Sequence, residues 1–326
     1  MTAEVSEKLP VTLLTGYLGA GKTTLLNRIL TENHGKKYAV VVNEFGEEGI
    51  DNDLVIDADE EIFEMNNGCI CCTVRGDLIR IVGGLLKRAD QLDGILIETT
   101  GLADPGPVIQ TFFVDDEIAE RVTLDAVVTM VDAKHFLDTV DDVHECEEQV
   151  AFADIIVLNK TDLVDQDKLS GVETKVRSLN KYANLYQTER AGIAIDNLLG
   201  RGAFDLKRLM EIEPGFLEED PEDHEHDDTI SSVSLKTTLP IQSDKFSEWM
   251  RTFIQERGVD VLRTKGILAL AGQERRYVFQ GVHMVMDSDW GAPWADGEAP
   301  ESRLVFIGRN LDANELESVF KACTVT

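Results

Sequence analysis

A phosphate-binding pattern lies close to the start of the chain. Residues 16–23 read Gly-Tyr-Leu-Gly-Ala-Gly-Lys-Thr, which matches G-x-x-x-x-G-K-[ST] at every fixed position. Glycines there let backbone N–H groups surround phosphate oxygens, and the N-terminus of the next helix adds partial positive charge. We therefore expect Lys22 to act in catalysis by neutralising the β- and γ-phosphates, and the Thr23 hydroxyl to ligate Mg²⁺. The nucleotide would also contact the residues around them, namely Gly16, Gly19, Ala20, Gly21 and Thr24.

A second motif indicates which base is bound. Asn159-Lys160-Thr161-Asp162 directly follows the apolar run 155–158, which places it at the end of a strand. The Asp162 carboxylate can accept hydrogen bonds from N1–H and the 2-amino group of guanine, whereas adenine lacks that pair of donors. The stem of Lys160 can lie along the plane of the base. Together with the phosphate-binding pattern, Asn159, Lys160 and Asp162 predict a site for GTP rather than ATP.

A third group of polar residues ends the apolar run 94–97. Glu98 is expected to act in catalysis, either by holding Mg²⁺ through a water or by orienting the attacking water. The backbone N–H of Gly101 can sense the γ-phosphate, as a switch loop does. The alternative is that Glu98 only caps the segment that follows. We identify no catalytic glutamine or arginine finger in the sequence, so intrinsic hydrolysis is expected to be slow.

Three of the five cysteines are clustered at Cys69, Cys71 and Cys72. In extended backbone Cys69 and Cys71 face the same side, and Cys72 joins them only through a turn. A helix N-terminus after them would lower the thiol pKa values and favour the thiolates that bind metals. Structural zinc sites usually have four protein ligands, so three neighbouring sulfurs leave room for a carboxylate, a water or an exchange partner. The cluster predicts a metal-transfer site; a redox pair or buried small cysteines are the alternatives.

Short apolar runs alternating with helical patterns predict the framework that holds these residues. The runs, at 11–14, 39–42, 94–97, 126–128 and 155–158, are typical of strands covered on both faces of a sheet. Helical spacing of apolar residues predicts helices over 24–30 and 74–86. The alternation predicts an α/β fold with a mostly parallel sheet flanked by helices.

The chain is expected to hold two domains. At 326 residues it is long enough for about two, since ~150 residues is a typical size. After an N-terminal tail over 1–10, the nucleotide-binding domain would span 11–210. Residues 211–229 form an acidic linker with His224 and His226, too poor in apolar residues to form a core. A smaller α+β domain would follow over 230–326, with strands at 230–239, 277–286 and 304–307 and helices at 244–257 and 312–323.

Charge narrows the range of partners. The sequence has 61 acidic and 31 basic residues, a formal net charge of −30, which disfavours nucleic acid and anionic membranes as partners. No apolar run is long enough to span a bilayer, and the first ten residues do not resemble a secretory signal. We expect a cytoplasmic protein. The sequence leaves its oligomeric state open, with a homodimer as one option.

These motifs together resemble the CobW-type metallochaperone GTPases, within the CobW/HypB/UreG-like class of P-loop GTPases. The resemblance extends over nearly the whole chain, and its most specific feature is Cys-x-Cys-Cys placed between residues 16–23 and Glu98-Thr99-Thr100-Gly101. It implies GTP hydrolysis and binding of a transition metal for insertion into a client metalloprotein. Asn43–Glu47 resembles the family's first switch region, so Glu44 and Glu47 become candidate metal ligands; a solvated acidic loop is the alternative.

The metal cargo has more than one interpretation. Zinc is favoured as the cargo, with cobalt as the alternative. Thiolates bind both metals similarly, and although zinc is the tighter in the usual affinity order, the ligands alone do not settle the choice. Cobalt delivery for cobalamin synthesis, or iron or cobalt delivery to a nitrile hydratase, would use the same residues. A nucleotide-switched metal buffer or regulator is the remaining alternative. His224 and His226 would capture zinc weakly or simply belong to a hydrophilic linker.

Overall fold

The computed structural model describes residues 8–43, 62–65, 73–204, 230–295 and 297–325. The chain divides into two compact units, of which the first contains residues up to 174 together with 183–205. The second contains residues 175–182 and the chain from 206 onward. The expected linker over 211–229 lies outside the described residues. No helix in the described parts is long and apolar enough to cross a membrane.

The first unit is built on a seven-stranded sheet in the order β3-β2-β4-β1-β5-β6-β7. Every neighbouring pair of strands is parallel, as the alternating pattern predicts. The strands are β1 (Leu9–Gly16), β2 (Tyr38–Asn43), β3 (Ile62–Met65), β4 (Gly94–Glu98), β5 (Val122–Asp132), β6 (Ile155–Asn159) and β7 (Asn184–Gln187). β1 thus begins at Leu9, which is buried, so Leu9 and Pro10 belong to the sheet and not to the expected tail.

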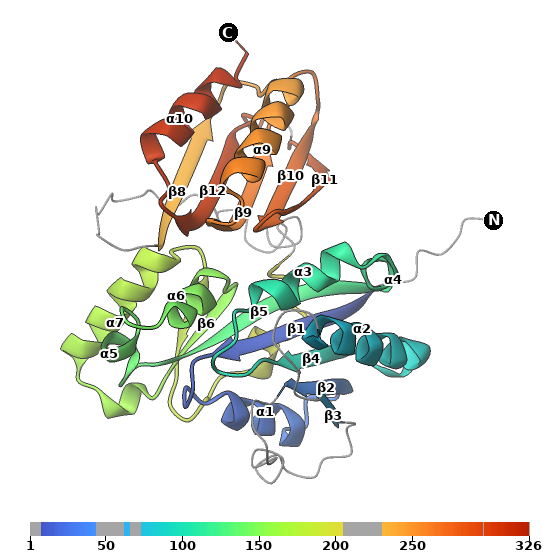
Figure 1. Ribbon diagram of the computed structural model, residues 1–326, viewed down its shortest axis with the longest axis vertical. Coiled ribbons are helices and arrows are strands. Elements are labelled where there is room, and N and C mark those ends of the chain that lie inside the picture. The colour runs from blue at the N-terminus through green and yellow to red at the C-terminus, as the bar shows by residue number, and fades with distance from the viewer. Residues whose placement is uncertain (1–7, 44–61, 66–72, 205–229, 296, 326) are drawn as a thin grey trace. The chain divides into compact units, whose positions relative to one another are not determined.

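Helices cover both faces of this sheet. They are α1 (Lys22–Thr31), α2 (Thr73–Leu85), α3 (Gly106–Val114), α4 (Asp116–Arg121), α5 (Phe136–Thr139), α6 (His144–Ala151) and α7 (Gln166–Leu179). From β1 to β2 the chain moves toward the β3 edge of the sheet. From β3 to β4, and from β4 to β5, it moves toward the β7 edge. Because such crossovers are right-handed, α1 covers one face and α2, α3 and α6 the other, as Figure 1 shows.

The α1 face has a continuous apolar core. Leu25, Leu26 and Ile29 of α1 are almost fully buried and pack with strand residues such as Val40 and Val128. The one-face spacing of these helix residues explains why the segment folds as an amphipathic helix. Residues 191–203 contribute further apolar side chains to the same core. The carboxyl ends of β1, β4, β5 and β6 thereby come to one edge of a rigid sheet.

The second unit is a five-stranded antiparallel sheet in the order β11-β10-β9-β12-β8. Its elements are β8 (Ile230–Thr237), α9 (Ser243–Arg257), β9 (Val261–Leu268), β10 (Arg275–Val282), β11 (Val285–Pro293), β12 (Ser302–Arg309) and α10 (Ala313–Ala322). Both helices pack on one core with the sheet, through residues such as Phe246, Phe306 and Phe320. The predicted α+β architecture is confirmed.

One predicted element of this unit is wrong in form. The run 277–286 is not a single strand; the chain turns at His283 and Met284, between β10 and β11. His283 has a φ of 51°, a left-handed conformation that the sequence does not signal because neither residue is glycine or asparagine. β9 was not predicted, because Arg263 and Lys265 interrupt its apolar pattern although both are buried in the central strands.

Candidate functional site

The phosphate-binding pattern forms the turn between β1 and α1. Gly16, Gly19 and Gly21 have φ values of 135°, 75° and 110°, which favour glycine. At two of them a side chain would also collide with the neighbouring strands. A Cβ on Gly16 would lie 2.3 Å from the carbonyl oxygen of Met130, and one on Gly21 would lie 2.5 Å from Nδ2 of Asn159. The loop therefore fits against the sheet only with glycines at these positions.

The charged and hydroxyl groups of the motif lie at the start of α1, which begins at Lys22. Lys22 is 8% exposed, and its Nζ donates to the carbonyl oxygens of Gly16 at 2.8 Å and Tyr17 at 3.4 Å. Its ammonium is thus held over the loop. Thr23 is half-buried in the first turn, and Thr24 is exposed. The N–H groups of a first helical turn and an adjacent ammonium form a site suited to an anion.

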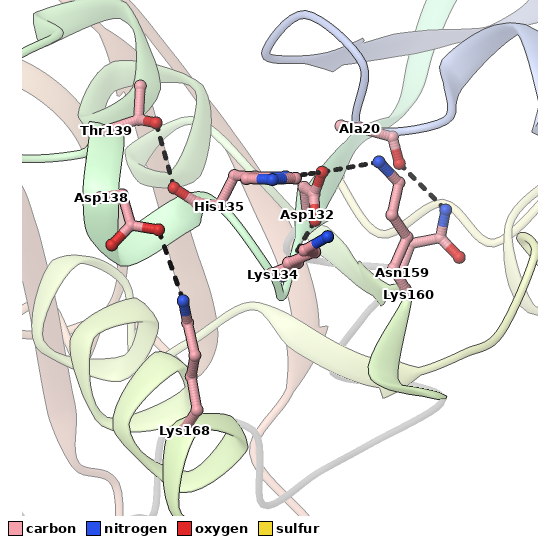
Figure 2. Close-up of polar contacts among 9 residues, drawn as sticks. All are labelled: Ala20, Asp132, Lys134, His135, Asp138, Thr139, Asn159, Lys160 and Lys168. Atoms are coloured by element: carbon pink, nitrogen blue, oxygen red, sulfur yellow. Dashed lines mark hydrogen bonds and ion pairs between the residues drawn. The ribbon is translucent and has the colours of Figure 1, made fainter. Parts of the chain in front are cut away.

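Asn159 connects the phosphate loop to a segment that follows β7. The side chain is 2% exposed, and its Nδ2 donates to the carbonyl oxygen of Ala20 at 2.9 Å (Figure 2). Its Oδ1 accepts from the backbone N–H of Ala191 at 2.8 Å and the hydroxyl of Thr188 at 3.3 Å. One buried amide therefore fixes three chain segments relative to one another. Asp162 lies nearby in sequence on a short 3-10 helix, Thr161–Leu163, and is exposed, so its carboxylate is accessible to a base.

Asp132 orients Lys160, and sequence reasoning missed this role. Lys160 has a φ of 62°, and its Nζ donates to Oδ2 of Asp132 at 2.6 Å (Figure 2). The same oxygen lies 3.0 Å from Nδ1 of His135, and Oδ1 accepts from the backbone N–H of Lys134 at 2.9 Å. Asp132 is paired in register with Asn159, so its position at the end of an apolar run was the available signal.

These contacts change the acidity of Asp132. Burial raises the pKa of its carboxyl, but the hydrogen bonds from His135, Lys160 and the Lys134 backbone, with the charge of Lys160, outweigh burial. The pKa is consequently held below its usual value, and the carboxylate stays ionised beside Lys160. A charge-assisted hydrogen bond of this kind restricts where the long lysine side chain can lie.

The segment after β4 approaches the phosphate loop. Glu98 is 6% exposed and paired in register with Leu14 of β1. The next residue, Thr99, donates its backbone N–H to the carbonyl oxygen of Leu14 at 2.9 Å. Its side-chain hydroxyl donates to the hydroxyl oxygen of Thr15, also at 2.9 Å. A Cβ on Gly101 would lie 2.7 Å from the backbone nitrogen of Leu18, so only glycine fits this approach. The predicted γ-phosphate contact at Gly101 therefore lies directly against the phosphate loop.

The predicted metal ligands Glu44, Glu47, Cys69, Cys71 and Cys72 lie outside the described residues, as do His224 and His226. Among the residues that the structure describes, no group of three His, Cys, Asp or Glu side chains is placed to hold a metal ion. The two described cysteines are buried. Burial, and then the nearby charges of Glu145 and Glu147, raise the pKa of Cys146 to about 12, so this thiol is a poor metal ligand.

Comparison with known proteins gives a consistent result for both units. The model of the CobW/HypB/UreG nucleotide-binding domain matches residues 10–187, and that of the cobalamin synthesis protein cobW C-terminal domain matches residues 230–324. The zinc chaperone YjiA of Escherichia coli is 38% identical over 318 residues, which cover 96% of this chain and 98% of that protein. The zinc chaperone CobW of Pseudomonas aeruginosa is 35% identical, with coverage of 95% and 91%.

The similarity extends to three dimensions. The crystal structure of Zn(II)-bound YjiA GTPase from E. coli has a TM-score of 0.81 and 33% sequence identity to this chain. The match covers 98% of this chain and all of that one. Such coverage includes both the parallel and the antiparallel sheet.

The ionised Asp132 generates a prediction about stability and pH. Because its pKa is lower in the folded than in the unfolded protein, Asp132 stabilises the fold above the unfolded value of about 3.9 and loses this effect as the pH falls through the folded value. We expect Asp132→Asn to lower the free energy of unfolding by roughly 1–2 kcal/mol at pH 7. The deficit should shrink below about pH 3.9. Urea unfolding followed by circular dichroism from pH 7 to pH 3 measures it.

Asp138→Asn is the matched control, because this aspartate is 68% exposed and pairs only with Lys168 in the described structure. Its effect should stay within about 0.5 kcal/mol at every pH. A deficit for Asp132→Asn that does not change with pH would contradict the assignment of an ionised, stabilising carboxylate.

Proposed function

Because the chain belongs to the CobW family in both its nucleotide-binding and its C-terminal domain, we propose that it is a GTP-hydrolysing metallochaperone. In this proposal it binds zinc and delivers it to a client metalloprotein. The single observation that carries the nucleotide part is the buried amide of Asn159. This residue begins the motif expected to read the base, and its amide bonds to the phosphate loop at Ala20 and to the segment after β7 at Ala191. The relatives named as zinc chaperones support the choice of zinc.

The guanine nucleotide would occupy the edge formed by the ends of β1, β4 and β6. Asp162 would accept from the guanine edge, and the Lys160 stem would lie along the base while Asp132 holds its ammonium. Gly16, Gly19, Ala20, Gly21 and Thr24 would surround the phosphates. Lys22 would exchange its carbonyl partners in the loop for the β- and γ-phosphate oxygens.

Mg²⁺ fits the residues at this edge. Thr23 supplies a hydroxyl in the first turn of α1, and Glu98 supplies a carboxylate at the end of the adjacent strand. Both are the hard oxygen donors that Mg²⁺ prefers, and the ion would neutralise phosphate charge when bound. Glu98 would orient the attacking water, and the N–H of Gly101 would meet the γ-phosphate. With no glutamine proposed to act in catalysis, intrinsic turnover is expected to be slow.

Zinc would be bound as cargo by Cys69, Cys71 and Cys72, with Glu44 or Glu47 as a further ligand. The support is chemical: neighbouring thiolates form a high-affinity but incomplete set, which leaves a position for exchange with a client. The first switch segment follows the phosphate loop in sequence, and GTP with Mg²⁺ orders such segments in GTPases. If a switch glutamate completes the zinc site, GTP raises the zinc affinity and hydrolysis lowers it.

Base selectivity gives the first prediction. Asp162→Asn removes an acceptor for the guanine N1–H and 2-amino donors and should lower GDP affinity by roughly 1–3 kcal/mol. Xanthine carries an oxygen where guanine has the 2-amino group, so the variant should gain affinity for XDP. Isothermal titration calorimetry with GDP, XDP and ADP measures both changes. The exposed neighbour Asp167→Asn is the control and should bind GDP like the wild type. Undiminished GDP binding by Asp162→Asn would show that the base is recognised elsewhere.

The second prediction concerns the coupling between nucleotide binding and zinc binding. Zinc affinity should be about 5–150-fold higher with a non-hydrolysable GTP analogue than with GDP, and zinc should tighten analogue binding by the same factor. Cys71→Ser should weaken zinc binding and abolish the coupling while the nucleotide still binds. Cys323→Ala, at a buried cysteine of the second unit, is the control. Competition titrations with a chelator supply the affinities; equal values in the two nucleotide states would exclude GTP-gated release.

A further inference from the structure

A buried glutamine outside every predicted motif contacts the segment after β4. Gln149 lies on α6 and is 1% exposed. Its Nε2 donates to the carbonyl oxygens of Gly101 at 3.2 Å and Ala103 at 3.1 Å. Both hydrogens of the carboxamide nitrogen are thus used on one short segment, which we call the Gly101 loop (residues 98–103). Burying an amide costs free energy unless its hydrogen bonds are made, so this side chain is committed to the loop.

The Gly101 loop is held from two sides. On the sheet side, Thr99 is tied to Leu14 and Thr15 of β1. On the other side, Gln149 donates to the carbonyl oxygens of Gly101 and Ala103. The backbone of Gly101 also lies close to Leu18 of the phosphate loop. The carbonyl of Gly101 belongs to the peptide next to the one that carries its N–H. Fixing the carbonyl therefore restricts the direction in which that N–H points.

A cavity lies beside α6, the helix that carries Gln149. Its volume is about 230 Å³, and Leu18, Cys146, Gln149 and Val150 are among the residues that line it. Space on this side leaves α6 and the phosphate loop less than tightly packed. α6 itself is anchored at the same residue, because the hydroxyl of Thr129 on β5 donates to the backbone carbonyl of Gln149 at 2.7 Å. Gln149 thus links the Gly101 loop to β5 of the sheet, through its side chain on one side and its backbone carbonyl on the other.

We propose that Gln149 is a positioning residue that aims the Gly101 N–H at the γ-phosphate and so determines how strongly the site distinguishes GTP from GDP. The inference rests on the proposed GTPase function. GDP lacks the γ-phosphate that the Gly101 N–H would contact. Loss of the carboxamide should therefore weaken binding of a GTP analogue and slow hydrolysis while leaving GDP binding intact.

The test compares Gln149→Leu and Gln149→Glu with the wild type, in the full chain with Mg²⁺. Leucine has similar bulk without donors, and the glutamate carboxylate keeps the shape but cannot donate when ionised. We expect the affinity for a non-hydrolysable GTP analogue to fall roughly three- to tenfold, as for one or two lost hydrogen bonds, with kcat reduced and GDP affinity within about twofold. Calorimetry gives the affinities, and phosphate release gives kcat and KM.

Thr111→Val is the matched control, because Thr111 is fully buried and its hydroxyl bonds only to Pro107 within α3 in the described structure. It should lower the melting temperature without changing the analogue-to-GDP affinity ratio. An unchanged ratio in both Gln149 variants, an equal change in Thr111→Val, or failure of both Gln149 variants to fold would overturn the positioning role. Absence of guanine nucleotide binding by the wild type would instead overturn the proposed function itself.

Discussion

The nucleotide site depends on one buried amide. Asn159 is the last residue of β6, and its side chain bonds both to the phosphate loop at Ala20 and to Thr188 and Ala191 after β7. A buried amide that loses its partners is costly, so these segments are stable only in their mutual arrangement. The close approach of Gly21 to the same amide shows how little room the arrangement leaves. The spacing between the phosphate loop and the segment after β7 is consequently built into the fold.

Two further polar side chains extend this arrangement to the rest of the site. Asp132 holds Lys160 on the base side, and Gln149 holds the loop that carries Gly101 on the γ-phosphate side. Both belong to elements that follow or end β5, the long strand beside β1. These hydrogen bonds would pre-organise the proposed site, to which Lys22 and Glu98 also belong. On this proposal, nucleotide binding would replace loop contacts such as that of Lys22 with contacts to phosphate oxygens.

Local pattern was enough to predict part of this structure. The β-branched runs predicted five strands of the parallel sheet, because a strand buried on both faces leaves a continuous apolar run. β9 and the turn at His283 were not predictable in this way, since tertiary burial of Arg263 and a left-handed histidine determine them. Asp132 and Gln149 were missed for a related reason. Each is a single polar residue whose role comes from partners distant in sequence, whereas the glycine-rich loop carries its chemistry within eight neighbouring residues.

We conclude that the Asn159 amide holds the phosphate loop and the segment after β7 in the arrangement that nucleotide binding requires. Calorimetric titration of GDP into Asn159→Ala measures this dependence, with circular dichroism to establish that the variant is folded. We expect a loss of roughly 2–3 kcal/mol in binding free energy, because the three hydrogen bonds to Ala20, Thr188 and Ala191 are removed. A folded Asn159→Ala protein that binds GDP as tightly as the wild type would show that this amide is not needed for the site.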